Sequence, residues 1–129
     1  MWEGINKRKF PRANYRCLLA IGREQSLRYL LTHTENIGVG GICAILDDHL
    51  PVFSRVDIEL ALKDERAPVQ CAGNVVWGVK NRSFKNSRQI TRFDTGIEFI
   101  DLKTSDRERI EKIVSKIAKT QTEKIDAGR

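Results

Sequence analysis

The chain has 129 residues, of which 40% are hydrophobic and 31% charged, with a formal net charge of +6. A chain of this length forms one domain and buries about two thirds of its unfolded surface. No apolar run approaches the roughly 18 residues that a membrane span needs, and the first residues lack the apolar stretch of a signal peptide. We therefore expect a cytoplasmic globular protein with no membrane insertion.

The positive charge is concentrated in two segments. Residues 1–28 contain seven basic and two acidic side chains, and residues 80–92 contain five basic side chains and no acid. Basic segments of this kind attract anionic partners, so the candidates are a small anionic ligand, nucleic acid or an acidic protein face.

The residues that could support catalysis or bind metal are isolated in sequence: Cys17, Cys43, Cys71, His33 and His49. The cysteines lack the Cys-x-x-Cys spacing of metal and redox sites, so we expect them to be small buried side chains in strands, and we expect no metal. Two isolated histidines do not assemble a nucleophile, base and orienting acid. The glycines at 38–41 lack the lysine and hydroxyl residue of a phosphate-binding loop. We expect no enzymatic activity.

Apolar and polar residues alternate with period two over six segments, which predicts six strands: 15–21, 27–34, 41–46, 56–62, 69–79 and 93–100. Turn signals separate them, beginning with residues 22–25. Gly73 is expected to mark a bulge in its strand. Residues 81–87 are polar and basic, and we expect an exposed hairpin loop with Phe84 at its tip.

A helix is predicted to start at residues 104–106. Its apolar residues then recur at helical spacing, at Ile110, Ile113, Val114, Ile117 and Ala118. Six antiparallel strands and one terminal helix predict a mainly β protein, a six-stranded antiparallel β-barrel with a C-terminal α-helix, since closure removes exposed sheet edges. We divide the chain into a basic arm (1–14), the barrel with its helix (15–120) and a polar tail (121–129).

The arm carries two arginines four positions apart, Arg8 and Arg12. Pro11 is incompatible with a helix interior, so this segment should precede the first strand as an extended arm. Each guanidinium offers a rigid fork of donors, which suits a phosphate or the edge of a guanine. Lys7 and Lys9 are auxiliary candidates. An isolated RxxxR pattern is usually a solvated basic terminus, so its meaning depends on a second motif.

The second motif is the segment Asn36-Ile37-Gly38-Val39-Gly40-Gly41. Three glycines in four residues permit positive φ and close backbone approach. Asn36 can cap a turn or present its amide to a ligand.

Together the two motifs resemble those of the PilZ family, RxxxR followed by [D/N]xSxxG. Arg8 and Arg12 match the first motif, and Asn36 and Gly41 match the ends of the second. Gly38 stands where the family usually has serine. Two later segments look like strands of the family, residues 74–77 (NVVW) and 95–102 (TGIEFIDL), so the resemblance covers about residues 7–118.

The resemblance implies a PilZ-like split barrel that acts as a bacterial cyclic di-GMP receptor. Arg8 and Arg12 would supply guanidinium forks to the guanines, whose O6 and N7 atoms accept such a pair of hydrogen bonds. Asn36 would contact a guanine, with Gly38 and Gly41 completing the site. Ligand binding would rearrange the N-terminal arm, and an unidentified effector protein would sense that change.

Two other functions compete with this one. Because Gly38 lacks the hydroxyl, the chain could be a degenerate PilZ domain that acts as a protein-interaction module without nucleotide binding. A single-stranded nucleic-acid-binding barrel is the third interpretation. The strands lack a row of aromatic side chains for base stacking, which argues against nucleic acid as a partner.

Overall fold

The computed structural model describes residues 12–23 and 28–127, with side chains up to residue 120. Seven strands precede one helix: β1 Arg12–Asn14, β2 Leu18–Arg23, β3 Tyr29–Gly38, β4 Gly41–Leu46, β5 Arg55–Ala61, β6 Val69–Lys85, β7 Arg88–Ile100 and α1 Thr104–Ala127.

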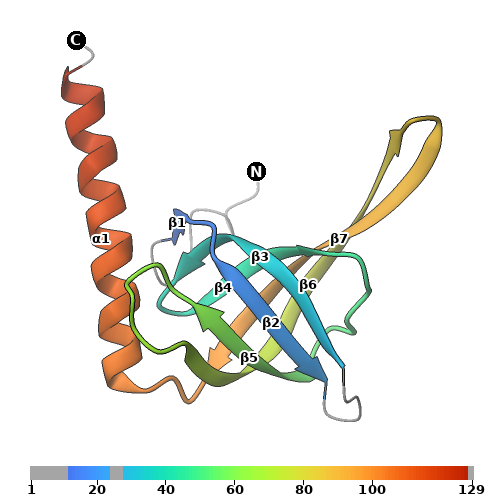
Figure 1. Cartoon of the computed structure of the whole chain (residues 1–129), viewed down its shortest axis with the longest axis horizontal. Coiled ribbons are helices and arrows are strands. Elements are labelled where there is room, and N and C mark those ends of the chain that lie inside the picture. The colour runs from blue at the N-terminus through green and yellow to red at the C-terminus, as the bar shows by residue number, and fades with distance from the viewer. Residues whose placement is uncertain (1–11, 24–27, 128–129) are drawn as a thin grey trace, which may run out of the picture.

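Six of these strands close into a barrel (Figure 1). Neighbouring strands are antiparallel in the order β3-β2-β5-β6-β7-β4, and β4 pairs back with β3. The short β1 adds to the barrel by pairing with the end of β3. The predicted mainly β fold, a closed six-stranded antiparallel barrel with a C-terminal helix, is confirmed.

The core fills the inside of the barrel with alternate residues of the strands. Leu19, Ile37, Leu60 and Ile97 are at most 1% exposed, and full burial of such a side chain contributes about 1.5 to 3 kcal/mol. Helix α1 covers one end of the barrel and packs against β1 and β3. Its buried residues, Ile110 among them, belong to the predicted apolar face.

The first predicted strand, 15–21, is wrong in its boundaries because the chain leaves the sheet between β1 and β2. The cause is Thr34, which is fully buried in β3. Its hydroxyl accepts a hydrogen bond from the Cys17 N–H (3.0 Å) and donates one to the Tyr15 carbonyl (2.7 Å). The side chain thus replaces part of the strand ladder at this point. This detour brings β1 beside the end of β3, so three residues that we assigned to the arm, 12–14, belong to the sheet.

The glycine-rich segment is also more regular than expected. The second strand, predicted at 27–34, continues to Gly38, so only Val39 and Gly40 form the turn before β4. None of the glycines in the described residues has positive φ. Gly41 is needed for a different reason than the turn conformation that we expected: a Cβ there would overlap the carbonyl oxygen of Ile97, so glycine permits the close approach of β4 and β7.

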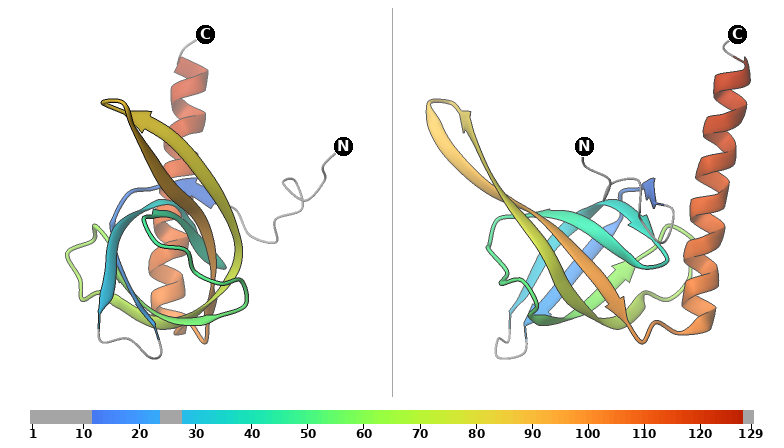
Figure 2. Two further views of the ribbon diagram at one scale, coloured as in Figure 1. Left: turned by 90° about the vertical axis from the view of Figure 1, so that its right-hand side faces the viewer. Right: turned by 180° about the vertical axis from the view of Figure 1, so that it is seen from behind.

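Strands β6 and β7 run on beyond the barrel as a long hairpin (Figure 2). The loop expected at 81–87 is wrong, because β6 continues to Lys85 and β7 begins at Arg88. Only Asn86 and Ser87 form the turn, with φ of 52° and 65°. Positive φ at both central residues is the requirement of a type I′ turn, whose twist suits a two-residue hairpin.

The bulge in β6 lies at Val76, where the register shifts between Val75 and Trp77, and not at Gly73 as expected. Gly73 is in the regular part of the strand, and the side chains of Ile58 and Ile97 occupy the space that its Cβ would take. The glycine therefore reflects core packing. The bulge lies just after Asn74, the last residue of β6 that pairs with β5, and Val76 lines the pocket described below.

Three further expectations need adjustment. Cys17 is buried but lies between strands, and Cys71 is only partly buried, although burial still raises the pKa of its thiol to about 11. Helix α1 continues to Ala127, through most of the segment that we assigned to the tail. Among the described helices, none is long and apolar enough to cross a membrane.

Candidate ligand-binding site

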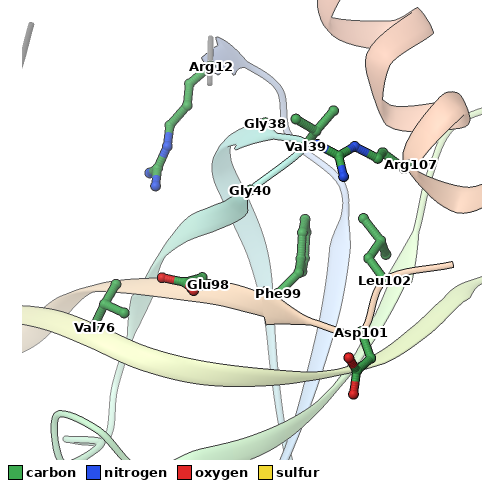
Figure 3. Close-up of a pocket in the computed structure, with 10 residues that line it drawn as sticks. All are labelled: Arg12, Gly38, Val39, Gly40, Val76, Glu98, Phe99, Asp101, Leu102 and Arg107. Carbon is green, nitrogen blue, oxygen red and sulfur yellow. The ribbon is translucent and has the colours of Figure 1, made fainter. Parts of the chain in front are cut away.

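A pocket of about 610 Å³ opens at the end of the barrel beside the base of α1 (Figure 3). It is formed by β1, the β3–β4 turn, parts of β6 and β7 and the first turn of the helix, and its lining residues are Arg12, Gly38, Val39, Gly40, Val76, Glu98, Phe99, Asp101, Leu102 and Arg107. Its volume is in the range of small-molecule sites.

Strand pairing brings the two sequence motifs together at this pocket. Arg12 lies opposite Gly38 in the β1–β3 ladder, and Asn14 lies opposite Asn36. The Arg12 Nη1 donates a hydrogen bond to the Asn36 Oδ1 over 3.3 Å, across 24 positions of sequence. The second arginine of RxxxR and the first residue of the downstream motif therefore form one unit on the barrel surface.

The remaining predicted site residues divide into two groups. Gly38 lines the pocket, whereas Gly41 lies buried behind it in β4 and is paired with Gly38 across the turn. Arg8, with Lys7 and Lys9, lies outside the described residues, and its role stays a prediction.

Several lining residues were missed by the sequence analysis. Figure 3 shows Phe99 directed toward the Gly38–Gly40 turn and Asp101 directed away from both arginines. Glu98 is exposed between buried Ile97 and Phe99. Its outward position was evident from the alternation in β7, but nothing in the sequence indicated that β7 passes below β1.

Arg107 was missed because its place depends on how α1 docks on the barrel. An ion-pair cluster fixes that docking: the Arg109 Nε and Nη2 donate to the two carboxylate oxygens of Asp64, both over 2.8 Å. The Arg109 Nη1 also donates to Asp106 over 3.0 Å. Because Asp64 belongs to the β5–β6 loop, the cluster ties the first turn of α1, and Arg107 with it, to the barrel.

This cluster is mostly shielded from water, with side-chain exposures of 10% for Arg109 and 24% for Asp64. The hydrogen bonds from Arg109 lower the pKa of Asp64, and those from Asp64 raise the pKa of Arg109. A charge-assisted, two-pronged pair of this kind favours one geometry. The rim of the pocket is therefore rigidly placed on its helix side.

The β3–β4 turn is fixed in a similar way on the other side. The Phe99 N–H donates to the Gly40 carbonyl over 2.9 Å, which holds the turn against β7. The lining of the pocket thus combines the guanidinium groups of Arg12 and Arg107 with the carboxylate of Glu98. Phe99 and Leu102 add apolar surface. Such a lining suits a planar, anionic and partly apolar ligand. Within the described part of the chain, no cluster of His, Cys, Asp or Glu is arranged to hold a metal ion.

The chain is thus a closed antiparallel barrel with an arginine-bearing pocket at its mouth. The model of the PilZ domain matches residues 6–116, and the chain therefore belongs to the PilZ domain family. A comparison with curated proteins finds no match.

Solved structures of PilZ proteins share this fold. The PilZ domain of YcgR from Escherichia coli, solved with c-di-GMP, has a TM-score of 0.69 at 14% identity and aligns over 93% of this chain and 98% of its own. MrkH of K. pneumonia in its apo state has a TM-score of 0.73 at 16% identity over 92% of this chain. The Bacillus subtilis inhibitor of motility, MotI/DgrA, has a TM-score of 0.66 at 16% identity over 92% of this chain. The chain spans about half the length of these last two, 52% in each case.

Proposed function

We propose that this PilZ domain binds cyclic di-GMP in the pocket beside Arg12 and acts as a receptor for it. The observation that carries the proposal is the hydrogen bond between Arg12 and Asn36, which joins the two motifs at the edge of a 610 Å³ pocket. Similar structures support the choice of ligand, since the YcgR domain and MrkH have been solved with c-di-GMP.

The pocket offers complementary groups to a guanine on two of its edges. The O6 and N7 atoms of guanine accept two hydrogen bonds from one guanidinium, the role proposed for Arg12 and, from the arm, Arg8. Glu98 lines the same pocket as Arg12, and its carboxylate would accept hydrogen bonds from the N1–H and 2-amino groups of guanine. Adenine lacks that pair of donors, so Glu98 favours guanine. Arg107 is placed to attract a phosphodiester group.

The residues before β1 supply the signalling step of the proposal. Arg12 begins β1 and lines the pocket, and Arg8 precedes it by four positions in the sequence. A ligand that contacts both arginines would draw the arm onto the barrel, and only the ligand-bound form would present that arrangement. An effector protein that recognises it would respond to the ligand.

Calorimetric titration of the purified chain with cyclic di-GMP tests the proposal, with GTP and a short DNA strand as control ligands. Arg12→Ala is expected to abolish measurable binding and to leave the melting temperature nearly unchanged, because Arg12 contributes no core packing. Arg16→Ala is the matched control, an exposed arginine outside the pocket, and should bind normally. Normal binding by Arg12→Ala would place the site elsewhere.

A further inference from the structure

The outer part of the β6–β7 hairpin, residues 79–94, forms a two-stranded ribbon. At its base, Phe93 and Asp94 still pair with β4, and beyond Arg92 the ribbon projects from the barrel. It projects from the side of the barrel away from α1 (Figures 1 and 2). Its seven cross-strand pairs run from Val79 opposite Asp94 to Lys85 opposite Arg88 at the tip. At about 3.3 Å per residue the ribbon extends for roughly 20 Å.

The ribbon is basic on both faces. Side chains alternate between faces along a strand, and directly opposed residues share a face. Lys85 and Arg88 therefore lie on one face with Arg92, and Lys80 and Arg82 lie on the other. All five belong to an interval, residues 80–92, without a single acidic residue.

Of these five cations, Arg92 is engaged in an ion pair with Asp47 in the loop after β4. The other four, Lys80, Arg82, Lys85 and Arg88, are exposed and have no carboxylate partner among the described residues. Like charges directly opposite each other destabilise a strand pair. The Lys85–Arg88 pair at the tip therefore costs stability in the free protein, and a bound anion would remove that cost.

We propose that this ribbon binds double-stranded DNA by entering its major groove. A two-stranded β-ribbon fits a groove about 12 Å wide and 8.5 Å deep. Both walls of the groove are phosphate backbones, so cations on both faces of the ribbon find partners at once. A flat anionic membrane or an acidic protein face would meet only one of the two faces. The exposed aromatic ring of Phe84, next to the tip, is available for apolar contact with base edges.

This binding mode differs from the one that the sequence argued against. A single strand needs aromatic side chains on which its bases stack. A duplex is held chiefly through its phosphates, and neutralising them with exposed basic side chains gives sequence-independent binding. The ribbon and the pocket are separate surfaces, so this binding does not depend on cyclic di-GMP.

Fluorescence anisotropy of the whole chain with a labelled 20-base-pair DNA duplex tests the proposal. Binding should weaken with added salt, with a slope of log K against log salt near −3.6, about 0.9 for each of four phosphates. Exchanging Lys80, Arg82, Lys85 and Arg88 together for glutamine should lower affinity at least tenfold at about 50 mM salt and flatten the slope.

The matched control removes the same charge elsewhere. Exchanging the exposed lysines at positions 103, 112, 116 and 119 for glutamine lowers the net charge by the same four units but leaves the ribbon intact. This control should lose no more than about threefold in affinity. Equal losses in both variants, each checked for folding by circular dichroism, would reduce the effect to net charge and overturn the proposal.

Two alternative anions complete the experiment. Vesicles with about 30% phosphatidylserine, and a 20-nucleotide single strand of the same sequence, should bind less tightly than the duplex. Binding to the vesicles without binding to the duplex would overturn the proposal in favour of a membrane contact. A clear preference for the single strand would overturn groove binding.

Discussion

Arg12 at the pocket and Arg88 at the tip of the ribbon carry the same charge in very different surroundings. Arg12 is half-buried and bonded to Asn36, and Arg109, which holds the helix that carries Arg107, lies between two carboxylates. Arg88 is exposed, and the residue opposite it is another cation, Lys85. Charges fixed by bonds define the position of a small ligand. Exposed charges on a projecting ribbon instead attract a large anion without dictating its position.

The largest expected contrast is between two arginine-to-alanine substitutions, one in the ion-pair cluster at the base of α1 and one at the tip of the ribbon. Arg109→Ala should lower the free energy of unfolding by roughly 2 to 3 kcal/mol, since it leaves two shielded carboxylates without their partner. Arg88→Ala should change it by less than about 0.5 kcal/mol. Urea denaturation of both variants measures the difference. Similar losses would mean that the cluster at the helix base contributes no more than a surface charge.

A pH titration sharpens the same contrast. Hydrogen bonds from Arg109 lower the pKa of Asp64 in the folded protein, so its stabilising effect is present above the unfolded value near 4 and is lost as the pH falls through the folded value. The free energy of unfolding should decline as the pH drops below about 4, and less steeply in Asp64→Asn. In an Arg109→Ala background, Asp64→Asn should alter this dependence much less, because only hydrogen bonds from backbone N–H groups, chiefly that of Arg66, then remain. An undiminished effect would mean that Arg109 is not the main partner of the Asp64 carboxylate.

A substitution at position 38 tests whether one added hydroxyl in the pocket raises the affinity for cyclic di-GMP. Because Gly38 does not have positive φ, serine would introduce no left-handed strain, and the variant should fold normally. One additional hydrogen bond is worth roughly 1 kcal/mol, so Gly38→Ser should tighten cyclic di-GMP binding about three- to tenfold. Calorimetry and a melting curve on the same sample measure both properties. Absence of binding in both proteins, with intact folding, would favour the degenerate interaction module.

The smallest effect is expected from the ribbon charges on the affinity for cyclic di-GMP. The four-glutamine ribbon variant should bind cyclic di-GMP within a few-fold of the unaltered chain, because exposed charges are screened within about a Debye length. The same titration as for Arg12→Ala measures it. A loss of affinity comparable with that of Arg12→Ala would mean that the ribbon is part of the cyclic di-GMP site.

The barrel was predictable because its strands have one face in the core and one in water. Apolar residues therefore alternate with polar ones along each strand, as Val56, Ile58 and Leu60 do in β5. The outer ribbon has water on both faces, so residues 80–92 show no such pattern and were assigned to a loop. The break after β1 was equally hidden, because it depends on Thr34, seventeen positions after Cys17 in the sequence.

The candidate site was predictable in part. The motifs identified Arg12, Asn36 and Gly38, since their spacing suits the pairing of β1 with β3. Glu98 and Arg107 come from elements that meet the pocket only through the closure of the barrel and the docking of α1. No local pattern encodes such an approach, which depends on contacts between distant parts of the chain.

Helix α1 begins beside the pocket and extends well beyond the barrel. Its 24 residues extend about 36 Å at 1.5 Å per residue. The side chains that pack on the core end at Ile117, and the rest of the helix projects past the barrel (Figure 1). Arg107, in the first turn of the helix, lines the pocket at the base of this projecting segment. By geometry, a tilt of about 10° at the base would displace the far end by roughly 6 Å. The Asp64–Arg109–Asp106 cluster opposes such a tilt. In a variant that lacks the cluster, a small displacement at the base would therefore be several times larger at the far end of the helix.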